Sequence, residues 1–139
     1  MALLEVGVRE LSKRLPKVLS PRTHALIDYG VAGAFFVGAG LLWGKSKRAA
    51  IASLACGAAE AAIILLSDYP GGIAKVISFE RHGQLDAALS GTIAMVPTVL
   101  GFPEQKKSIF FRAQAVGTAI TTGLTDFKAT GRSHRRRAA

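Results

Sequence analysis

Two histidines, each followed four residues later by an aspartate, are the residues of this sequence best suited to chemistry. The pairs are His24 with Asp28 and His82 with Asp86. Residues four apart lie on one face of a helix, close enough for an imidazole to hydrogen-bond a carboxylate. Such a pair can hold a proton, or it can present an oriented imidazole to a metal or a haem. Each motif therefore predicts a polar site on one helix face.

The two motifs are 58 residues apart, and the same separation relates Asp68 to Asp126. An ungapped comparison of the chain with itself at this offset also aligns Lys-Val-Leu-Ser (17–20) with Lys-Val-Ile-Ser (75–78). Apolar matches arise readily by chance, but coincident histidines and aspartates do not, so we interpret the chain as two repeats. The repeats predict a polar site at one end of the molecule, formed by His24, Asp28, Asp68, His82, Asp86 and Asp126.

This polar site has two interpretations. In the functional one, the histidines bind a metal or a haem, or the carboxylates collect protons. In the structural one, which we favour, the His–Asp pairs tie adjacent hairpins together. Asp68 and Asp126 are then expected near helix C-termini, where the dipole disfavours them, and His24 and His82 are their expected partners. The sequence has no phosphate loop, nucleophile elbow or zinc-ligand spacing. We therefore predict neither an enzyme nor a metal site, and the sequence identifies no cofactor.

Glu60 is a separate candidate, because it is predicted to lie near the middle of an apolar segment. An unpaired charge at that depth in a membrane would cost roughly 3 kcal/mol or more. Glu60 must then be protonated, hydrogen-bonded or paired, which makes it a candidate intramembrane proton or hydrogen-bond site. Its counterpart at the 58-residue offset is Thr118, so the two repeats differ here.

Four apolar segments must position these residues. Half of the 139 residues are hydrophobic and 19% are charged, which is too little charge for a soluble domain of this size. Each segment has close to the ~20 residues that a helix needs to cross a bilayer. They span residues 25–43, 49–67, 84–102 and 108–126. We predict an all-α fold: a four-transmembrane-helix bundle made of two parallel repeats of a helical hairpin, preceded by a short interfacial amphipathic helix.

The predicted organisation has four parts. Residues 1–16 form the interfacial helix, 17–72 the first two-helix repeat, 73–130 the second, and 131–139 a basic disordered tail. Lysines and arginines are in excess on the side that carries both termini, which predicts that both are cytoplasmic. The net charge of +9 is accordingly expected to attract anionic lipid headgroups, and we predict no nucleic-acid binding.

Small residues recur at every fourth position in several of these segments. Small side chains let helix backbones approach closely in lipid. They predict tight helix pairs and are compatible with a homo-oligomer. The predicted packing residues are Gly30, Ala34, Gly38, Gly57, Ala61 and Gly117.

The pattern resembles the SPW-repeat group of small bacterial membrane proteins. The resemblance covers residues 17 to 127, and it lies in the duplicated two-helix units and in the His and acid that open the odd-numbered helices. It also includes the stretch 96–102, where Pro97 takes the place of the group's proline although the Ser-Pro-Trp tripeptide itself is absent. The resemblance implies a multi-pass protein of the bacterial inner (plasma) membrane, and it implies no activity.

Three functions remain open at this point. We favour an accessory, assembly or scaffold subunit that acts through helix–helix contacts with a membrane-protein partner, because short loops leave little room for an extramembrane active site. The alternative is a small proton- or ion-coupled transporter that uses Glu60 with Asp28 and Asp86. The second alternative is a haem- or pigment-binding protein with His24 and His82 as ligands.

Overall fold

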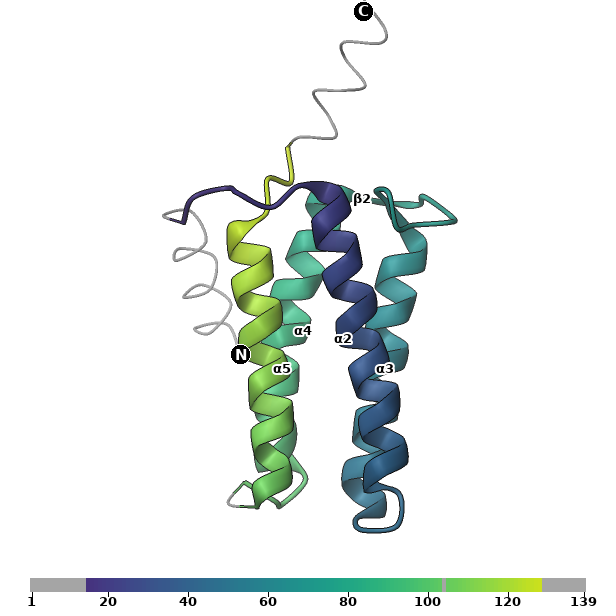
Figure 1. Cartoon of the computed structure of the whole chain (residues 1–139), viewed down its shortest axis with the longest axis vertical. Coiled ribbons are helices and arrows are strands. Elements are labelled where there is room, and N and C mark those ends of the chain that lie inside the picture. The colour runs from purple at the N-terminus through teal and green to yellow at the C-terminus, as the bar shows by residue number, and fades with distance from the viewer. Residues whose placement is uncertain (1–14, 104, 129–139) are drawn as a thin grey trace, which may run out of the picture.

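The computed structural model describes residues 15–103 and 105–128, and this part of the chain is mostly helical (Figure 1). Its four long helices run side by side. They are α2 (Pro21–Leu42), α3 (Lys47–Leu66), α4 (Phe79–Val99) and α5 (Lys106–Leu124). The all-α prediction is confirmed. The predicted tail lies outside the described residues, and so does the predicted amphipathic helix except for residues 15 and 16.

Serine residues begin three of these helices. Ser20, Ser46 and Ser78 each have an extended backbone, and each hydroxyl accepts a hydrogen bond from the backbone N–H three residues later. This is the N-cap arrangement that satisfies an otherwise unpaired N–H of the first turn. Because Ser78 is such a cap, α4 begins at Phe79, ahead of the apolar segment predicted from residue 84. The motif His82/Asp86 therefore lies wholly inside the helix.

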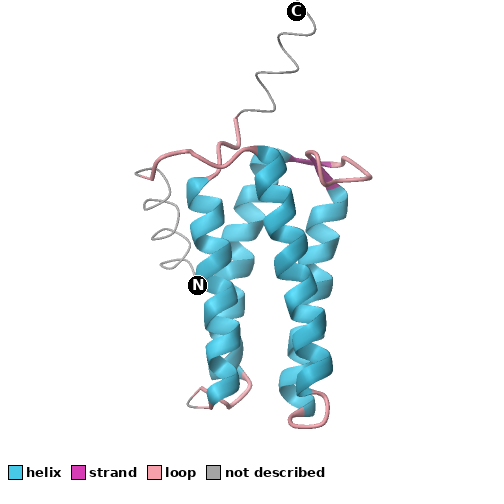
Figure 2. Cartoon of the chain, viewed as in Figure 1, coloured by secondary structure: helices cyan, strands magenta, loops and turns pink. Residues whose placement is uncertain are grey.

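Two short backbone pairings close the bundle at one end. Strand β1 (Ser67–Asp68) pairs in parallel with β2 (Ile77–Ser78), so the end of α3 lies beside the start of α4. A parallel bridge between Leu19 and Thr125 likewise joins the start of α2 to the end of α5. The 58-residue offset relates Ser67 to Thr125 and Ile77 to Leu19. Figure 2 shows both described chain ends and the strands at this end, with the two hairpin loops at the other.

An apolar cluster fills the part of the bundle toward the hairpin loops. Phe35, Ile93 and Phe111 are fully buried within it. Helices α2 and α3 approach closely here, because a Cβ added at Gly57 would lie 3.0 Å from Phe35 Cβ. Gly38 is also tightly enclosed, with a Phe110 ring atom 2.7 Å from the position of an added Cβ.

Gly38 and Gly57, two of the predicted packing residues, face neighbouring helices closely, and two others do not face another helix of this chain. Added Cβ atoms at Gly30 and Gly117 would meet nothing within 4 Å in this chain. Both glycines are on outward-facing positions of their helices. Four-residue spacing identifies a helix face without showing which face a neighbouring helix covers.

Among the described helices, α2 and α3 are long and apolar enough to cross a membrane. Helices α4 and α5 are of similar length, but they are less apolar and do not meet that standard. Length and composition therefore support two membrane crossings.

Candidate metal centre

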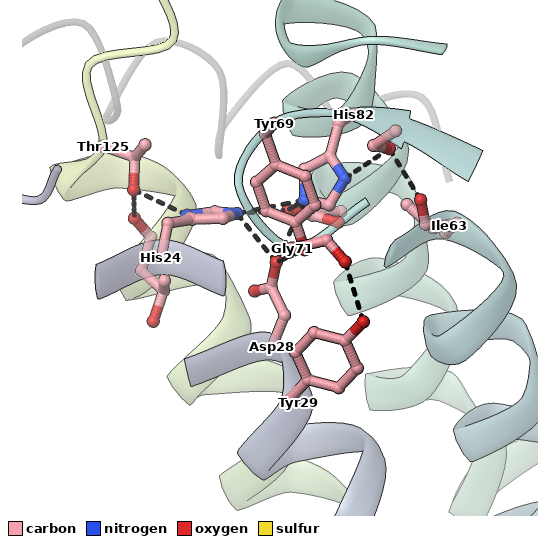
Figure 3. A network of polar contacts seen from close by, with 11 residues as sticks. His24, Asp28, Tyr29, Ile63, Tyr69, Gly71, His82 and Thr125 are labelled. Carbon is pink, nitrogen blue, oxygen red and sulfur yellow. Dashed lines mark hydrogen bonds and ion pairs between the residues drawn. The ribbon is translucent and has the colours of Figure 1, made fainter. Parts of the chain in front are cut away.

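The two His–Asp motifs meet inside the bundle. His24 and Asp28 come from the first two turns of α2, and His82 and Asp86 from the first two turns of α4. All four side chains are buried, with exposed fractions between 0% and 3%. Figure 3 shows His24 and His82 turned toward one another, with the Asp28 carboxylate beside them.

The facing atoms form a compact four-membered cluster. The two Nε2 atoms, of His24 and His82, are 3.1 Å apart. Asp86 Oδ2 lies 3.1 Å from each of these nitrogens. Asp28 Oδ2 lies 3.3 Å from Nε2 of His24 and 3.1 Å from Nε2 of His82. One ligand atom from each of the four residues therefore lies within 4.8 Å of the others.

The outer nitrogens of both rings are held by hydroxyl groups. His82 Nδ1 is 2.8 Å from Ser67 Oγ, and that hydroxyl donates its hydrogen to Ile63 O at 2.6 Å. His24 Nδ1 is 2.7 Å from Thr125 Oγ1, which donates to the Thr121 carbonyl. Because each hydroxyl has one hydrogen and has already given it to a carbonyl, it can only accept from Nδ1–H. Both Nδ1 atoms therefore carry protons, and the Nε2 atoms are the ring nitrogens that face the two carboxylates.

Two imidazole lone pairs and two carboxylates facing one another repel unless positive charge lies between them. Two added protons would balance the carboxylates, but they would place two imidazolium N–H groups 3.1 Å apart. A divalent ion would balance the same charge and use all four lone pairs. Tetrahedral Zn²⁺ with bonds of 2.0–2.1 Å has ligand atoms about 3.3 Å apart. The five nitrogen–nitrogen and nitrogen–oxygen separations given above match that spacing, and the sixth, between the two carboxylate oxygens, is at most 4.8 Å.

Aromatic rings cover the cluster at the end of the bundle where strands β1 and β2 lie. The Tyr69 ring lies 4.6 Å from that of His82 and stacks on Phe79 at 5.3 Å. Phe127 lies 5.3 Å from the His24 ring. Gly83 makes room for it, because an added Cβ there would lie 2.6 Å from the Phe127 ring. These rings exclude water from the cluster and so strengthen its electrostatic interactions.

The Tyr69 hydroxyl donates a hydrogen bond of 2.9 Å to Asp28 Oδ2. Burial, followed by the nearby Asp28 carboxylate, raises the pKa of Tyr69 above its ordinary value. Tyr69 therefore remains a protonated donor at neutral pH. Its hydrogen bond fixes the orientation of one cluster carboxylate.

Of the six residues predicted for this site, the structure brings together four. Asp68 is partly exposed and pairs with Lys75 at 3.7 Å. Asp126 accepts a hydrogen bond from the Lys128 backbone N–H. The expected pairing of these two aspartates with the histidines is therefore wrong. The hydroxyl residues immediately before them, Ser67 and Thr125, take that role.

Glu60 lies deeper in the bundle than the cluster. It is 1% exposed, and neither carboxyl oxygen has a hydrogen-bond partner in the structure. Glu60 is about 10 Å along the α3 axis from Ser67, at 1.5 Å per residue. The ionisable groups that interact electrostatically with it are Asp86, Asp28 and His82.

No protein-family model, curated protein or solved structure matches this chain.

Proposed function

We propose that the chain is a four-span membrane scaffold whose two hairpins are joined by a divalent transition-metal ion, with Zn²⁺ as the best fit. His24, Asp28, His82 and Asp86 are the proposed ligands. The single observation that carries the proposal is the cluster geometry: each imidazole Nε2 lies 3.1–3.3 Å from the other Nε2 and from one oxygen of each carboxylate. Two imidazole nitrogens and two carboxylate oxygens are ligands that suit Zn²⁺.

The distribution of side chains on α4 and α5 supports the two further membrane crossings. Their buried polar residues include Ser90, Thr118, Thr121 and Thr122, all of which face the bundle interior. Outward positions carry Met95 and Val99 on α4 and Ile109, Val116 and Ile120 on α5. Mean hydropathy averages both faces, so it understates how apolar the outward surface is. A helix needs an apolar surface only where it meets lipid.

One end of each hairpin carries residues suited to the membrane interface. Trp43 is half exposed at the end of α2, and Lys47 lies 3.9 Å from its ring centroid. Arg112, in the first turns of α5, reaches back to the Pro103 carbonyl. Tryptophan and long basic side chains are typical of the headgroup region. We propose that this end is extracytoplasmic in a bacterial inner membrane, and that the ends of the chain are cytoplasmic.

The number of protein ligands favours a structural role over catalysis. Structural zinc sites have four protein ligands, whereas catalytic sites keep one position for water or substrate. Here four ligand atoms come from the protein and aromatic rings cover them. Two ligands come from each hairpin, so a bound ion would fix how the hairpins pack. This supports the predicted scaffold or assembly role.

The two alternative functions receive less support from this geometry. A haem bound by both histidines must lie between their nitrogens, and a 3.1 Å separation leaves no room for a porphyrin. A transport path through Glu60, Asp28 and Asp86 would have to continue through the apolar cluster around Phe35 and Phe111.

Metal analysis of the purified protein tests the proposal. Protein without an affinity tag would be extracted in mild detergent, exposed to Zn²⁺ or Co²⁺, desalted and analysed by elemental mass spectrometry. We expect one ion per chain, and a tetrahedral visible spectrum with Co²⁺. The variant His82→Gln should lose the ion. Asp68→Asn is the matched control, because Asp68 belongs to the same end of the bundle but not to the cluster.

Wild-type protein that takes up neither ion would refute the proposal. Equal retention of the ion by wild type and His82→Gln would show that the ion binds elsewhere. If Asp68→Asn also lost the ion, the loss would reflect general disruption of this end of the bundle.

A further inference from the structure

Arg48 joins the first hairpin to the second at the end of the bundle opposite the strands, where both hairpin loops lie (Figure 1). It belongs to the first turn of α3, and its guanidinium donates a 2.7 Å hydrogen bond to the Leu100 carbonyl at the end of α4. Gly101, the next residue, has a φ of +73°. A Cβ added there would lie 3.3 Å from Arg48 Nη1, so the turn that follows α4 adjoins the guanidinium.

Two more cations contact the residues that follow this turn. The Lys107 ammonium lies 5.2 Å from the ring centroid of Phe102, and Arg112 donates a 3.3 Å hydrogen bond to the Pro103 carbonyl. Positive charge from three side chains, and from both hairpins, is therefore gathered around residues 100–103. The two ends of this stretch are three residues apart and so at most about 11 Å from one another. A headgroup placed on the stretch is within reach of all three flexible side chains.

No carboxylate pairs with these three cations in the described part of the chain. The ion pairs there involve other residues, such as Lys75 with Asp68 at the strand end. In the sequence, residues 43–48 and 100–112 together contain six basic residues and one acidic residue. The contacts of the three cations are with carbonyl oxygens and an aromatic ring. These neutral partners orient the cations and leave their positive charge unbalanced.

Exposed apolar side chains lie next to the cations. Val99, the last residue of α4, is 73% exposed, and Ile109, in the first turn of α5, is 65% exposed. Trp43, a residue type typical of the headgroup region, is half exposed at the same end. Positive charge beside an exposed apolar surface matches an amphiphile whose negative headgroup adjoins its acyl chains.

We propose that residues 100–103 and the three cations around them form a binding site for the headgroup of an anionic phospholipid. The phosphodiester accepts hydrogen bonds from Arg48 and Arg112, because guanidinium groups match the oxygens of a phosphate, and Lys107 adds a point charge. The acyl chains lie along the exposed ends of α4 and α5. This inference rests on the proposed function, which places both helices in the membrane. A lipid bound here joins the hairpins at the end opposite the metal cluster.

Thermal unfolding of the protein in mild detergent tests the proposal. Unfolding temperatures would be measured over a series of phosphatidylglycerol concentrations, with net-neutral phosphatidylcholine of the same acyl chains as the comparison. A ligand that binds the folded state raises the unfolding temperature once its concentration exceeds its dissociation constant. We expect phosphatidylglycerol to stabilise wild type more than phosphatidylcholine does. Arg48→Gln keeps a donor for the Leu100 carbonyl and loses the charge, so its apparent phosphatidylglycerol affinity should fall about tenfold or more.

Two further variants make the result specific to this site. Arg112→Gln tests the same site from the second hairpin if Arg48→Gln does not fold, and it should also weaken the lipid effect. Arg81→Gln is the matched control, because Arg81 is an exposed arginine at the strand end of α4, and it should keep the full effect.

Three results would overturn the proposal. The first is equal stabilisation of wild type by the two lipids. The second is equal weakening in Arg48→Gln and Arg81→Gln, which would show a general attraction of the basic surface to anionic micelles. The third is stabilisation by inorganic phosphate as strong as that by phosphatidylglycerol, because the site would then bind free phosphate instead of a lipid.

Two measurements on the same samples separate these results from failure of the proposed function. Zinc content reports on the metal site, which the lipid site does not require. Protein that stays soluble and folded after removal of the detergent would refute the membrane placement itself. Loss of lipid selectivity in protein that binds zinc and requires detergent would refute the lipid site alone.

Discussion

Removing the Ser67 hydroxyl should weaken metal binding without touching any metal ligand. Ser67 Oγ accepts from His82 Nδ1 at 2.8 Å and so directs the Nε2 lone pair into the cluster. In Ser67→Ala the imidazole loses this partner, its buried N–H is left unpaired, and its proton is free to move to Nε2. Loss of such an outer partner typically lowers metal affinity by about 10- to 100-fold. That range corresponds to about 1.4–2.7 kcal/mol of binding free energy.

The assay is competition for Zn²⁺ between the detergent-solubilised protein and a chromophoric chelator. Ser53→Ala is the matched control, because Ser53, on α3, is like Ser67 a fully buried serine whose hydroxyl donates to a backbone carbonyl, in this case that of Phe35. Each variant loses a hydrogen bond worth about 1 kcal/mol of stability. Only Ser67→Ala should also lose Zn²⁺ affinity. Equal Zn²⁺ affinity in the two variants would refute the assignment of lone pairs to Nε2.

Three other predictions concern stability. Replacing Tyr69 by Phe removes the hydrogen bond to Asp28 and should lower the free energy of unfolding by about 1.5–3 kcal/mol, measured by chemical unfolding. Because the pKa of Tyr69 is raised in the folded state, its contribution is present below the ordinary tyrosine pKa of about 10 and declines above it. The stability of wild type should therefore fall more steeply at alkaline pH than that of the variant. Gly83→Ala should destabilise by about 1–3 kcal/mol, since its Cβ meets the Phe127 ring, whereas Gly30→Ala should be neutral or stabilising by up to about 1 kcal/mol. Thermal scans of this pair test the packing, and similar unfolding temperatures would contradict it. Chelation of the ion should lower the unfolding temperature of zinc-loaded wild type, and unchanged scans after complete removal would exclude a stabilising ion.

The helical elements were predictable because their determinants are local. Each apolar segment has the length of a long helix, and charged or glycine-containing joints separate the segments. Ser20 and Ser78 precede helices in the manner of N-caps, and α4 begins directly after Ser78, five residues before the apolar segment 84–102. A hydropathy pattern misses a first helical turn that is polar. Such a turn still belongs to the helix when its polar side chains are buried against a neighbouring helix.

The composition of the site was predictable only in part. Four-residue spacing places each imidazole beside its own aspartate, and the repeat indicates that two such pairs share one end. Ser67 and Thr125 contact the histidines in place of the predicted Asp68 and Asp126. Which of two neighbouring residues faces inward depends on the direction of each side chain at the helix end. Neighbouring residues there point in different directions, so a hydroxyl that faces inward leaves the next carboxylate facing outward. The spacing of residues within each helix does not determine how closely side chains of two different helices approach. The 3.1 Å separation of the two Nε2 atoms was therefore not predictable from the sequence.

The bridge between Leu19 and Thr125 also indicates that the chain should tolerate circular permutation. This bridge joins the first described residues to the last ones. The pairing of Ser67 with Ile77 joins the two ends of the linker between α3 and α4 in the same way. The four helices thus form a closed ring in space. The chain itself is open at one of the two corresponding connections, the one between α5 and α2. A circular permutant that begins within residues 70–76 and joins 128 to 15 through a short linker would keep every contact of the cluster. Its two hairpins would simply be synthesised in the opposite order.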